Sequence, residues 1–209
     1  TFMFGVQGDS HPERLNRMFH PDLYVRTMEN VRRDRPDFYF LMGDDFNPVR
    51  LYNTDKINAE AIAGLYAYQR RFLQIIGRES AVYLVNGNHE EAARYLLDGT
   101  PNSLPVLTGR ARNSHFSLPA PDGFYTGDAE PVEHLGLRRD YYAWTWGDAL
   151  FVTLDPYWHS PAQIDSDLKR LDTKILDGAV VHIVGHHKGP EPTFLLTVDR
   201  KSTRLNSSH

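Results

Sequence analysis

The sequence predicts one α/β domain in which two mixed β-sheets pack face to face and helices flank them. In the N-terminal half, short apolar segments with strand character alternate with amphipathic helical segments, which is the order expected for a parallel sheet. Later in the chain, two apolar segments flank Gly147-Asp148 like the strands of a hairpin and indicate a second sheet. A chain of 209 residues suits a single domain with a sizeable core.

Three strands and two helices account for the N-terminal half. We expect strands at residues 2–7, 38–42 and 81–85, and helices at residues 21–35 and 59–76. Proline and glycine mark the helix ends, because Pro36 follows the first helix and Gly77 follows the second. The apolar residues at helical spacing are Tyr24, Val25, Met28 and Val31 in the first helix and Ile62, Leu65, Phe72, Leu73 and Ile76 in the second.

The middle of the chain has weaker periodicity. Residues 90–97 are predicted to form a short helix that ends before Gly99. Residues 98–140 are rich in proline, glycine and asparagine, and we interpret them as a long irregular insertion with a short strand at residues 115–118. Insertions of this length without regular structure are uncommon unless they are functional.

The C-terminal part is expected to complete the second sheet. Residues 141–146 and 150–155 form the predicted hairpin. Leucine and isoleucine at helical spacing predict a helix around residues 168–175, with Gly178 as its C-cap. A final strand is predicted at residues 180–184, just before Gly185-His186-His187.

Composition excludes several classes of function. The formal charge of −4 and the absence of a Lys/Arg run argue against dedicated nucleic-acid binding. With no cysteine, thiol catalysis, thiolate metal sites and disulfides are excluded for this stretch. No apolar run approaches the roughly 20 residues of a membrane span, and we predict none.

Three clusters of potential metal ligands follow the three predicted strands. Strand ends at the carboxyl edge of an open α/β sheet are where such folds keep their chemistry. Carboxylates, imidazoles and amides there suit a pair of divalent ions, with one carboxylate able to bridge them. The clusters are Asp9-Ser10-His11, Gly43-Asp44-Asp45-Phe46-Asn47 and Gly87-Asn88-His89-Glu90.

The spacing within the first cluster supports this interpretation. Asp9 and His11 are two residues apart, so their side chains point the same way in extended backbone and can bind one ion together. A turn aspartate beside a surface histidine is the alternative for this pair alone, but the later clusters disfavour it. In the second cluster, Gly43 allows a sharp exit from the strand and a close approach of the backbone to the metals.

Together these motifs resemble the calcineurin-like metallophosphoesterase family, which includes the purple acid phosphatase relatives. The family pattern is D-x-H, G-D-x-x-[D/N], G-N-H-[E/D], a lone histidine and a final G-H-x-H, and the resemblance covers residues 2–187. It implies a four-layer α/β/β/α sandwich. It also implies a metal-dependent phosphomonoesterase or phosphodiesterase with two divalent ions, Mn, Fe or Zn, and a metal-bound water or hydroxide as nucleophile.

The resemblance also assigns roles to individual residues. It implies that the metal ligands are Asp9, His11, Asp44, Asn88 and His186, with Asp44 as the bridging carboxylate. His89 would be the catalytic histidine that contacts the phosphoryl group and donates a proton to the leaving oxygen, a role that suits an imidazole.

Further residues are candidates for supporting or substrate-contacting roles. Asn47 stands where purple acid phosphatases have an iron-bound tyrosine, and we expect it to support the ligands. His187 is the neighbour of the predicted ligand His186, and Asp45 is expected to be solvated or to cap a helix. The aromatic segment that ends with His159 could flank a leaving group or anchor a loop.

The C-terminal end departs from the family pattern, because the final G-H-x-H is absent. Residues 199–209 resemble one reading frame of a sequencing adapter, and we interpret them as a non-native tail. We therefore expect residues 1–198 to be a phosphoesterase domain truncated at its C-terminus and at its N-terminus.

The rival function is a non-catalytic scaffold of the same fold that binds a protein partner. Such scaffolds usually lose the ligands and the catalytic histidine. Here the predicted ligands of the first three motifs and His89 are all present, which favours an enzyme acting on a phosphate-ester substrate.

Overall fold

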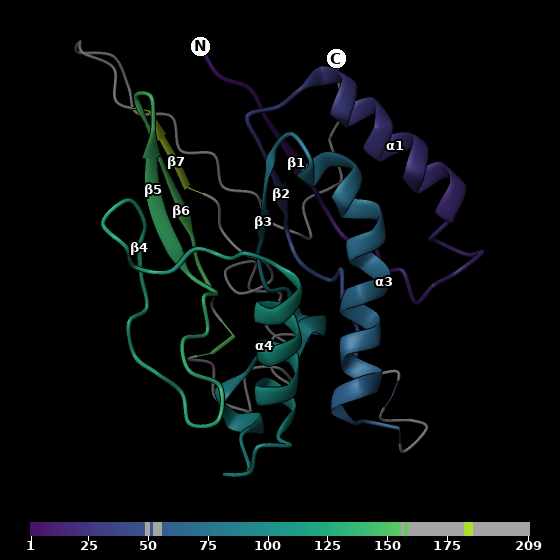
Figure 1. Cartoon of the computed structure of the whole chain (residues 1–209), viewed down its shortest axis with the longest axis vertical. Coiled ribbons are helices and arrows are strands. Elements are labelled where there is room, and N and C mark those ends of the chain that lie inside the picture. The colour runs from purple at the N-terminus through teal and green to yellow at the C-terminus, as the bar shows by residue number, and fades with distance from the viewer. Residues whose placement is uncertain (49–50, 52–55, 156, 159–181, 186–209) are drawn as a thin grey trace, which may run out of the picture.

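The computed structural model describes residues 1–48, 51, 56–155, 157–158 and 182–185. Within this part of the chain, helices lie on one side of a first sheet and a second sheet lies on its other side (Figure 1). The elements are β1 (Phe4–Gln7), α1 (Pro21–Asp34), β2 (Phe38–Leu41), α3 (Ala59–Gly77), β3 (Ala81–Leu84), η1 (Asn88–Glu90), η2 (Arg94–Leu96), α4 (Leu104–His115), β4 (Thr126–Gly127), β5 (Tyr142–Trp146), β6 (Ala149–Thr153) and β7 (His182–Gly185).

The first sheet has the strand order β1-β2-β3, and its strands are parallel. Phe4 pairs with Phe38, and Phe38 pairs with Ala81, so the three strands end nearly level with one another. Helices α1 and α3 provide the crossover connections that parallel neighbours require. The predicted strands and both predicted helices of the N-terminal half are confirmed, with ends shifted by a residue or two.

The second sheet has the order β4-β5-β6-β7 and is antiparallel. The predicted hairpin is confirmed, since β5 and β6 pair across a turn in which Gly147 has a φ of 60°. Among the described strands, the pairings of the first sheet are all parallel and those of the second are all antiparallel. Helical crossovers connect the strands of the first sheet and make them parallel, whereas the tight turn between β5 and β6 makes these two strands antiparallel.

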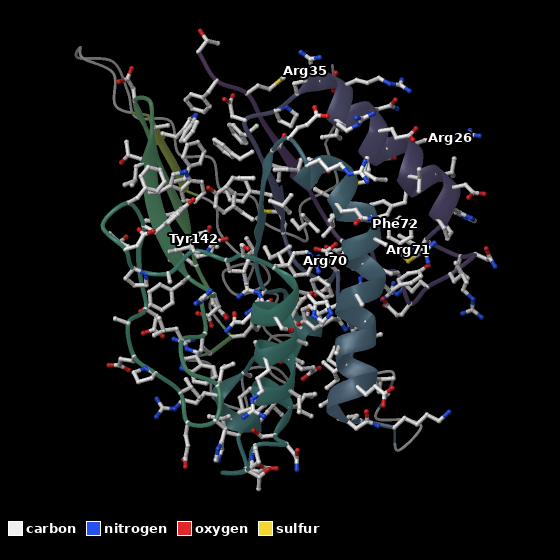
Figure 2. The ribbon with its side chains drawn as sticks, in the orientation of Figure 1. Arg26, Arg35, Arg70, Arg71, Phe72 and Tyr142 are labelled. Atoms are coloured by element: carbon white, nitrogen blue, oxygen red, sulfur yellow. The ribbon has the colours of Figure 1, made fainter. Side chains whose placement is uncertain are left out.

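One core lies between the first sheet and the helices. Tyr39 and Leu41 of β2 point into it and meet α3, which contributes the fully buried Ile62 and Ile76. Phe72 comes from the same helix, whereas Arg26 and Arg35 project outward at α1 (Figure 2). The apolar residues that recur at helical spacing in the sequence therefore face the sheet.

A second, aromatic core lies between the two sheets. Phe38 and Phe40 alternate with the residues that face the helices, so they point toward the second sheet. There they meet Tyr142 and Trp144 of β5 and Phe151 of β6. The ring centroids of Phe38 and Phe151 are 5.0 Å apart. This core holds the two sheets face to face.

The region after β3 differs from the prediction. The helix predicted at residues 90–97 is wrong, because the chain there has only the end of the 3-10 turn η1 and the 3-10 turn η2. The segment predicted as an irregular insertion contains α4, which ends at His115, so the strand predicted at 115–118 is wrong and the short strand of this region is β4. Pro105 fits the first turn of α4, and the burial of Leu104, Leu107 and Ala111 stabilises the helix.

The outer helical layer beyond the second sheet cannot be compared with the prediction, because residues 168–175 lie outside the described part. The last predicted strand is present as β7, which pairs with β6. None of the described helices is long and apolar enough to cross a membrane.

Candidate metal centre

The three predicted ligand motifs meet at one edge of the first sheet. Each motif follows a strand, and β1, β2 and β3 are parallel neighbours whose carboxyl ends lie side by side. This is the edge at which open α/β sheets hold their ligands.

His11, Asp44 and His89 form the centre of this region. The Nε2 atom of His11 is 3.5 Å from Oδ2 of Asp44, and Nε2 of His89 is 3.4 Å from the same oxygen. Their candidate ligand atoms all lie within 4.8 Å of one another. His11 and Asp44 are buried, but the side chain of His89 is 30% exposed and can be reached from solvent.

Asp9 and Asn88 are the other two predicted ligands among the described residues. Oδ2 of Asp9 is 3.5 Å from Nε2 of His11, a separation compatible with two ligands of one ion. Asn88 begins η1 and precedes His89 at the end of the third strand. The other predicted site residues, His159, His186 and His187, lie outside the described residues.

The donor atoms at this centre fit a divalent transition metal. Imidazole nitrogen and carboxylate oxygen bind such ions at about 2.0–2.2 Å, so two donors on one ion lie about 3.0–3.5 Å apart. The separations of 3.5 Å from Nε2 of His11 to Oδ2 of Asp44 and to Oδ2 of Asp9 fall within this range. Nitrogen and oxygen donors of this kind suit Mn, Fe or Zn.

A glycine contact sets the distance between the second and third motifs. Gly43 has a φ of 98°, and a Cβ atom placed on it would lie 2.2 Å from the backbone nitrogen of Gly87. Asp44 follows in the left-handed region with a φ of 56°, a conformation that costs a non-glycine residue about 1–2 kcal/mol. The chain thus turns sharply after β2, and the two loops touch through their backbones.

Glu90 ties the same two loops together. Its buried carboxylate accepts hydrogen bonds from the backbone N–H groups of Asp44 at 3.0 Å, Asp45 at 2.9 Å and Phe46 at 3.1 Å, and from that of Gly87 at 2.5 Å. Burial raises the pKa of Glu90 to about 7, although these N–H groups favour its ionised form. The last residue of the third motif therefore shapes the backbone that presents Asp44.

Asp45 is buried, so its predicted role as a solvated or helix-capping residue is wrong. Its Oδ1 accepts hydrogen bonds from Ser10 Oγ at 2.6 Å, from Gln7 Nε2 at 3.2 Å and from Gln69 Nε2 at 3.4 Å. Burial and then the charge of Glu90 raise its pKa well above the usual range. The side chain joins the ends of β1 and β2 to α3, a contact between elements that neighbouring residues in the sequence do not reveal.

The two histidines of the centre differ in their electrostatics. Hydrogen bonds to Asp9 and Glu13 raise the pKa of His11 to about 9. Burial and the positive charge of His11 lower the pKa of His89. In the metal-free protein at neutral pH, His11 is therefore charged and His89 neutral, so a metal that binds His11 displaces a proton.

Glu13 is a site residue that the motif pattern does not include. Its Oε1 is 2.8 Å from Nδ1 of His11 and accepts a hydrogen bond from Nδ2 of Asn47 at 3.1 Å. Burial opposes ionisation of Glu13, but the hydrogen bonds from His11 and Asn47 outweigh it and lower the pKa of the carboxyl. Asn47 is thus connected to His11 through the carboxylate of Glu13.

The loop after β6 also supports the site, a contact that the sequence does not indicate. Asn86 Nδ2 donates to Oδ2 of Asp155 at 2.9 Å, and Oδ1 of Asp155 accepts the backbone N–H of Tyr157 at 2.9 Å. Tyr157 and Trp158 are buried in this loop. Their contacts favour the loop-anchoring alternative over contact with a leaving group.

The geometry defines a class of protein: an α/β sandwich of two sheets with a candidate metal centre at the carboxyl edge of its parallel sheet. The model of the calcineurin-like phosphoesterase family matches residues 2–204, and the chain belongs to this family. Members of the family are generally phosphoester hydrolases and typically bind divalent metals. The comparisons with curated proteins and with solved structures returned no match.

Proposed function

We propose that the protein is a phosphoester hydrolase, acting on a monoester or a diester, that works with two divalent ions. The observation that carries this proposal is the convergence of His11, Asp44 and His89 within 4.8 Å at the sheet edge, in a chain of this family. In this proposal Asp9 and His11 bind one ion, Asp44 bridges to the second, and Asn88 binds the second.

His186 is the proposed fifth ligand, on the ground of the family pattern alone. When bound, the ions would lower the pKa of a water molecule and neutralise the charge of the phosphoryl group. The nitrogen and oxygen donors admit Mn, Fe or Zn.

His89 is the proposed proton donor to the leaving oxygen. One contact and the exposure of the ring support this role. Its backbone N–H donates to Oδ1 of Asp44 at 2.9 Å, which fixes the residue next to the proposed bridging carboxylate, and its partly exposed ring can meet a substrate. The charge on a bound phosphate would favour the protonated imidazole that this step requires. The side chain of Asp44 has no exposed surface, and its carboxylate would hold the ions.

The experiment that tests this proposal is a metal titration with chromogenic phosphomonoester and phosphodiester substrates. Protein stripped with a chelator should gain hydrolytic activity on addition of Mn²⁺, Fe²⁺ or Zn²⁺. His89→Ala should lower kcat by about 10²- to 10⁴-fold while metal content is retained, because a proton donor but no ligand is lost. Asp44→Asn should lower both kcat and metal content.

A matched control is His134→Ala, since His134 pairs with the exposed Glu133 outside the centre. This variant should keep the activity of the parent. If the metal-loaded parent hydrolyses neither substrate class while still binding metal, the non-catalytic scaffold becomes the better account. Equal loss of metal and activity in His89→Ala would make His89 a ligand instead.

A further inference from the structure

We propose that Glu13 is a positioning residue that aims Nε2 of His11 at the metal centre, and that Asn47 holds Glu13 in place. This inference rests on the proposed function, because it concerns how one proposed ligand is oriented.

The ring of His11 is contacted on both of its nitrogen atoms. Nδ1 lies 2.8 Å from Oε1 of Glu13, and Nε2, on the other edge of the ring, lies 3.5 Å from Oδ2 of Asp44. A carboxylate can only accept at Nδ1, so Nδ1 carries the proton and Nε2 is the atom directed at the centre. Metal-binding histidines commonly donate their other N–H to a carboxylate in this way, which fixes the tautomer and the ring orientation.

The backbone brings Glu13 back to the ring. His11 has a φ of 44°, in the left-handed region, and its carbonyl accepts the N–H of Arg14 at 2.9 Å to close a tight turn. The N–H of His11 donates to the carbonyl of Asp44 at 3.2 Å, which joins this turn to the loop after β2. Strained backbone of this kind persists only where surrounding contacts support it.

Glu13 is itself held by its surroundings. Its side chain is 9% exposed, it accepts from Nδ2 of Asn47 at 3.1 Å, and Nε of Arg14 lies 3.5 Å from the same oxygen. Asn47 belongs to the second ligand motif, so the contact couples the first motif to the second. A carboxylate fixed by other groups can orient an imidazole with little further loss of side-chain freedom.

The test combines nuclear magnetic resonance and calorimetry on the whole chain. In the metal-free parent, labelled with ¹⁵N-histidine, we expect a hydrogen-bonded Nδ1–H signal from His11, assigned by its loss in His11→Gln. Glu13→Ala should lose this signal and bind Mn²⁺ about 10- to 100-fold more weakly. Glu13→Gln keeps an acceptor oxygen and should recover part of the signal and of the affinity.

Two further variants make the result specific. Asn47→Ala should weaken Mn²⁺ binding by a smaller factor than Glu13→Ala, and it keeps the proposal testable if Glu13→Ala does not fold. Glu79→Ala is the matched control, because Glu79 pairs with Arg32 at the exposed surface, and it should bind Mn²⁺ like the parent.

The outcomes separate this inference from the proposed function. If Glu13→Ala keeps the Nδ1–H signal and the affinity for Mn²⁺ of the parent, Glu13 does not position His11. If the parent binds no Mn²⁺, the proposed function fails, and the Nδ1–H signal alone then decides whether Glu13 holds the ring.

Discussion

At the scale of single residues, glycine decides how closely the loops after β2 and β3 approach. A methyl group on Gly43 would meet the backbone nitrogen and Cα of Gly87 at 2.2 and 2.6 Å, and its φ of 98° disfavours any L side chain. Gly43→Ala should therefore lower the free energy of unfolding by about 2 kcal/mol or more and weaken metal binding. Urea unfolding and calorimetry measure the two effects.

Gly64, in α3, provides the comparison within the same chain. Nothing lies within 4 Å of a Cβ atom placed there, so Gly64→Ala should raise the free energy of unfolding by up to about 1 kcal/mol through helix propensity. Similar destabilisation by both substitutions would contradict the special role assigned to the contact between Gly43 and Gly87.

His11 makes the stability of the metal-free protein depend on pH. Its pKa is raised from 6.5 to about 9 in the folded state by Asp9 and Glu13, so its contribution is fully present below the unfolded-state pKa and is lost as the pH rises through about 9. With a chelator present, the difference in unfolding free energy between the parent and His11→Gln should shrink from pH 6 to pH 10. A difference that grows over this range would reverse the assigned sign.

Sequence alone indicates part of the site at this scale. Asp9, His11, Asp44 and His89 can be located because each occupies a fixed place in a motif after a strand. Glu13 and the buried contacts of Asp45 could not be found in this way, because they depend on a backbone turn and on α3, which no local pattern in the sequence records.

At the scale of elements, one carboxylate joins the loop after β2 to η1. Glu90→Gln replaces one carboxylate oxygen with an amide N–H₂, which leaves either the N–H groups of Asp44 and Gly87 or those of Asp45 and Phe46 without an acceptor. We expect a loss of about 1–3 kcal/mol in unfolding free energy, measured by urea titration. Metal affinity should fall with it.

The control for this substitution is Glu133→Gln, because the side chain of Glu133 is 82% exposed. Its unfolding free energy should stay within about 0.5 kcal/mol of the parent. Unchanged stability and metal affinity in Glu90→Gln would show that the loop keeps its shape without the carboxylate.

Helix α4 shows where prediction of elements from the sequence fails. Proline, glycine and asparagine in residues 98–140 suggest irregular structure, yet the apolar positions Leu104, Leu107 and Ala111 pack into the core beside α3. Arg112 donates to the carbonyls of Leu84 and Arg139 and fixes the helix against the end of β3. Tertiary contacts of this kind override weak local preference.

At the scale of the whole molecule, the alternation along β6 tests whether the two sheets face each other. Phe151 is fully buried between them, whereas its neighbour Leu150 is 39% exposed. Phe151→Ala should lower the unfolding free energy by about 3–5 kcal/mol, because the cavity borders Phe38 and Trp144. Thermal or urea unfolding gives the value.

Leu150→Ala removes a side chain from the opposite face of β6. It should lower the free energy of unfolding by much less than Phe151→Ala does. Equal losses would mean that the face-to-face packing does not hold.

The two-sheet arrangement itself was predictable, because crossover helices and a tight hairpin leave little choice of topology. The direction of pairing within each sheet follows from the same connections.

Anomalous X-ray diffraction from crystals grown with Mn²⁺ would show whether this sheet edge holds metal. We expect two anomalous peaks about 3.5–4 Å apart, with Asp44 contacting both and Asp9 and His11 contacting one. Crystals that contain Mn²⁺ elsewhere but show no peak within bonding distance of His11 or Asp44 would contradict this expectation.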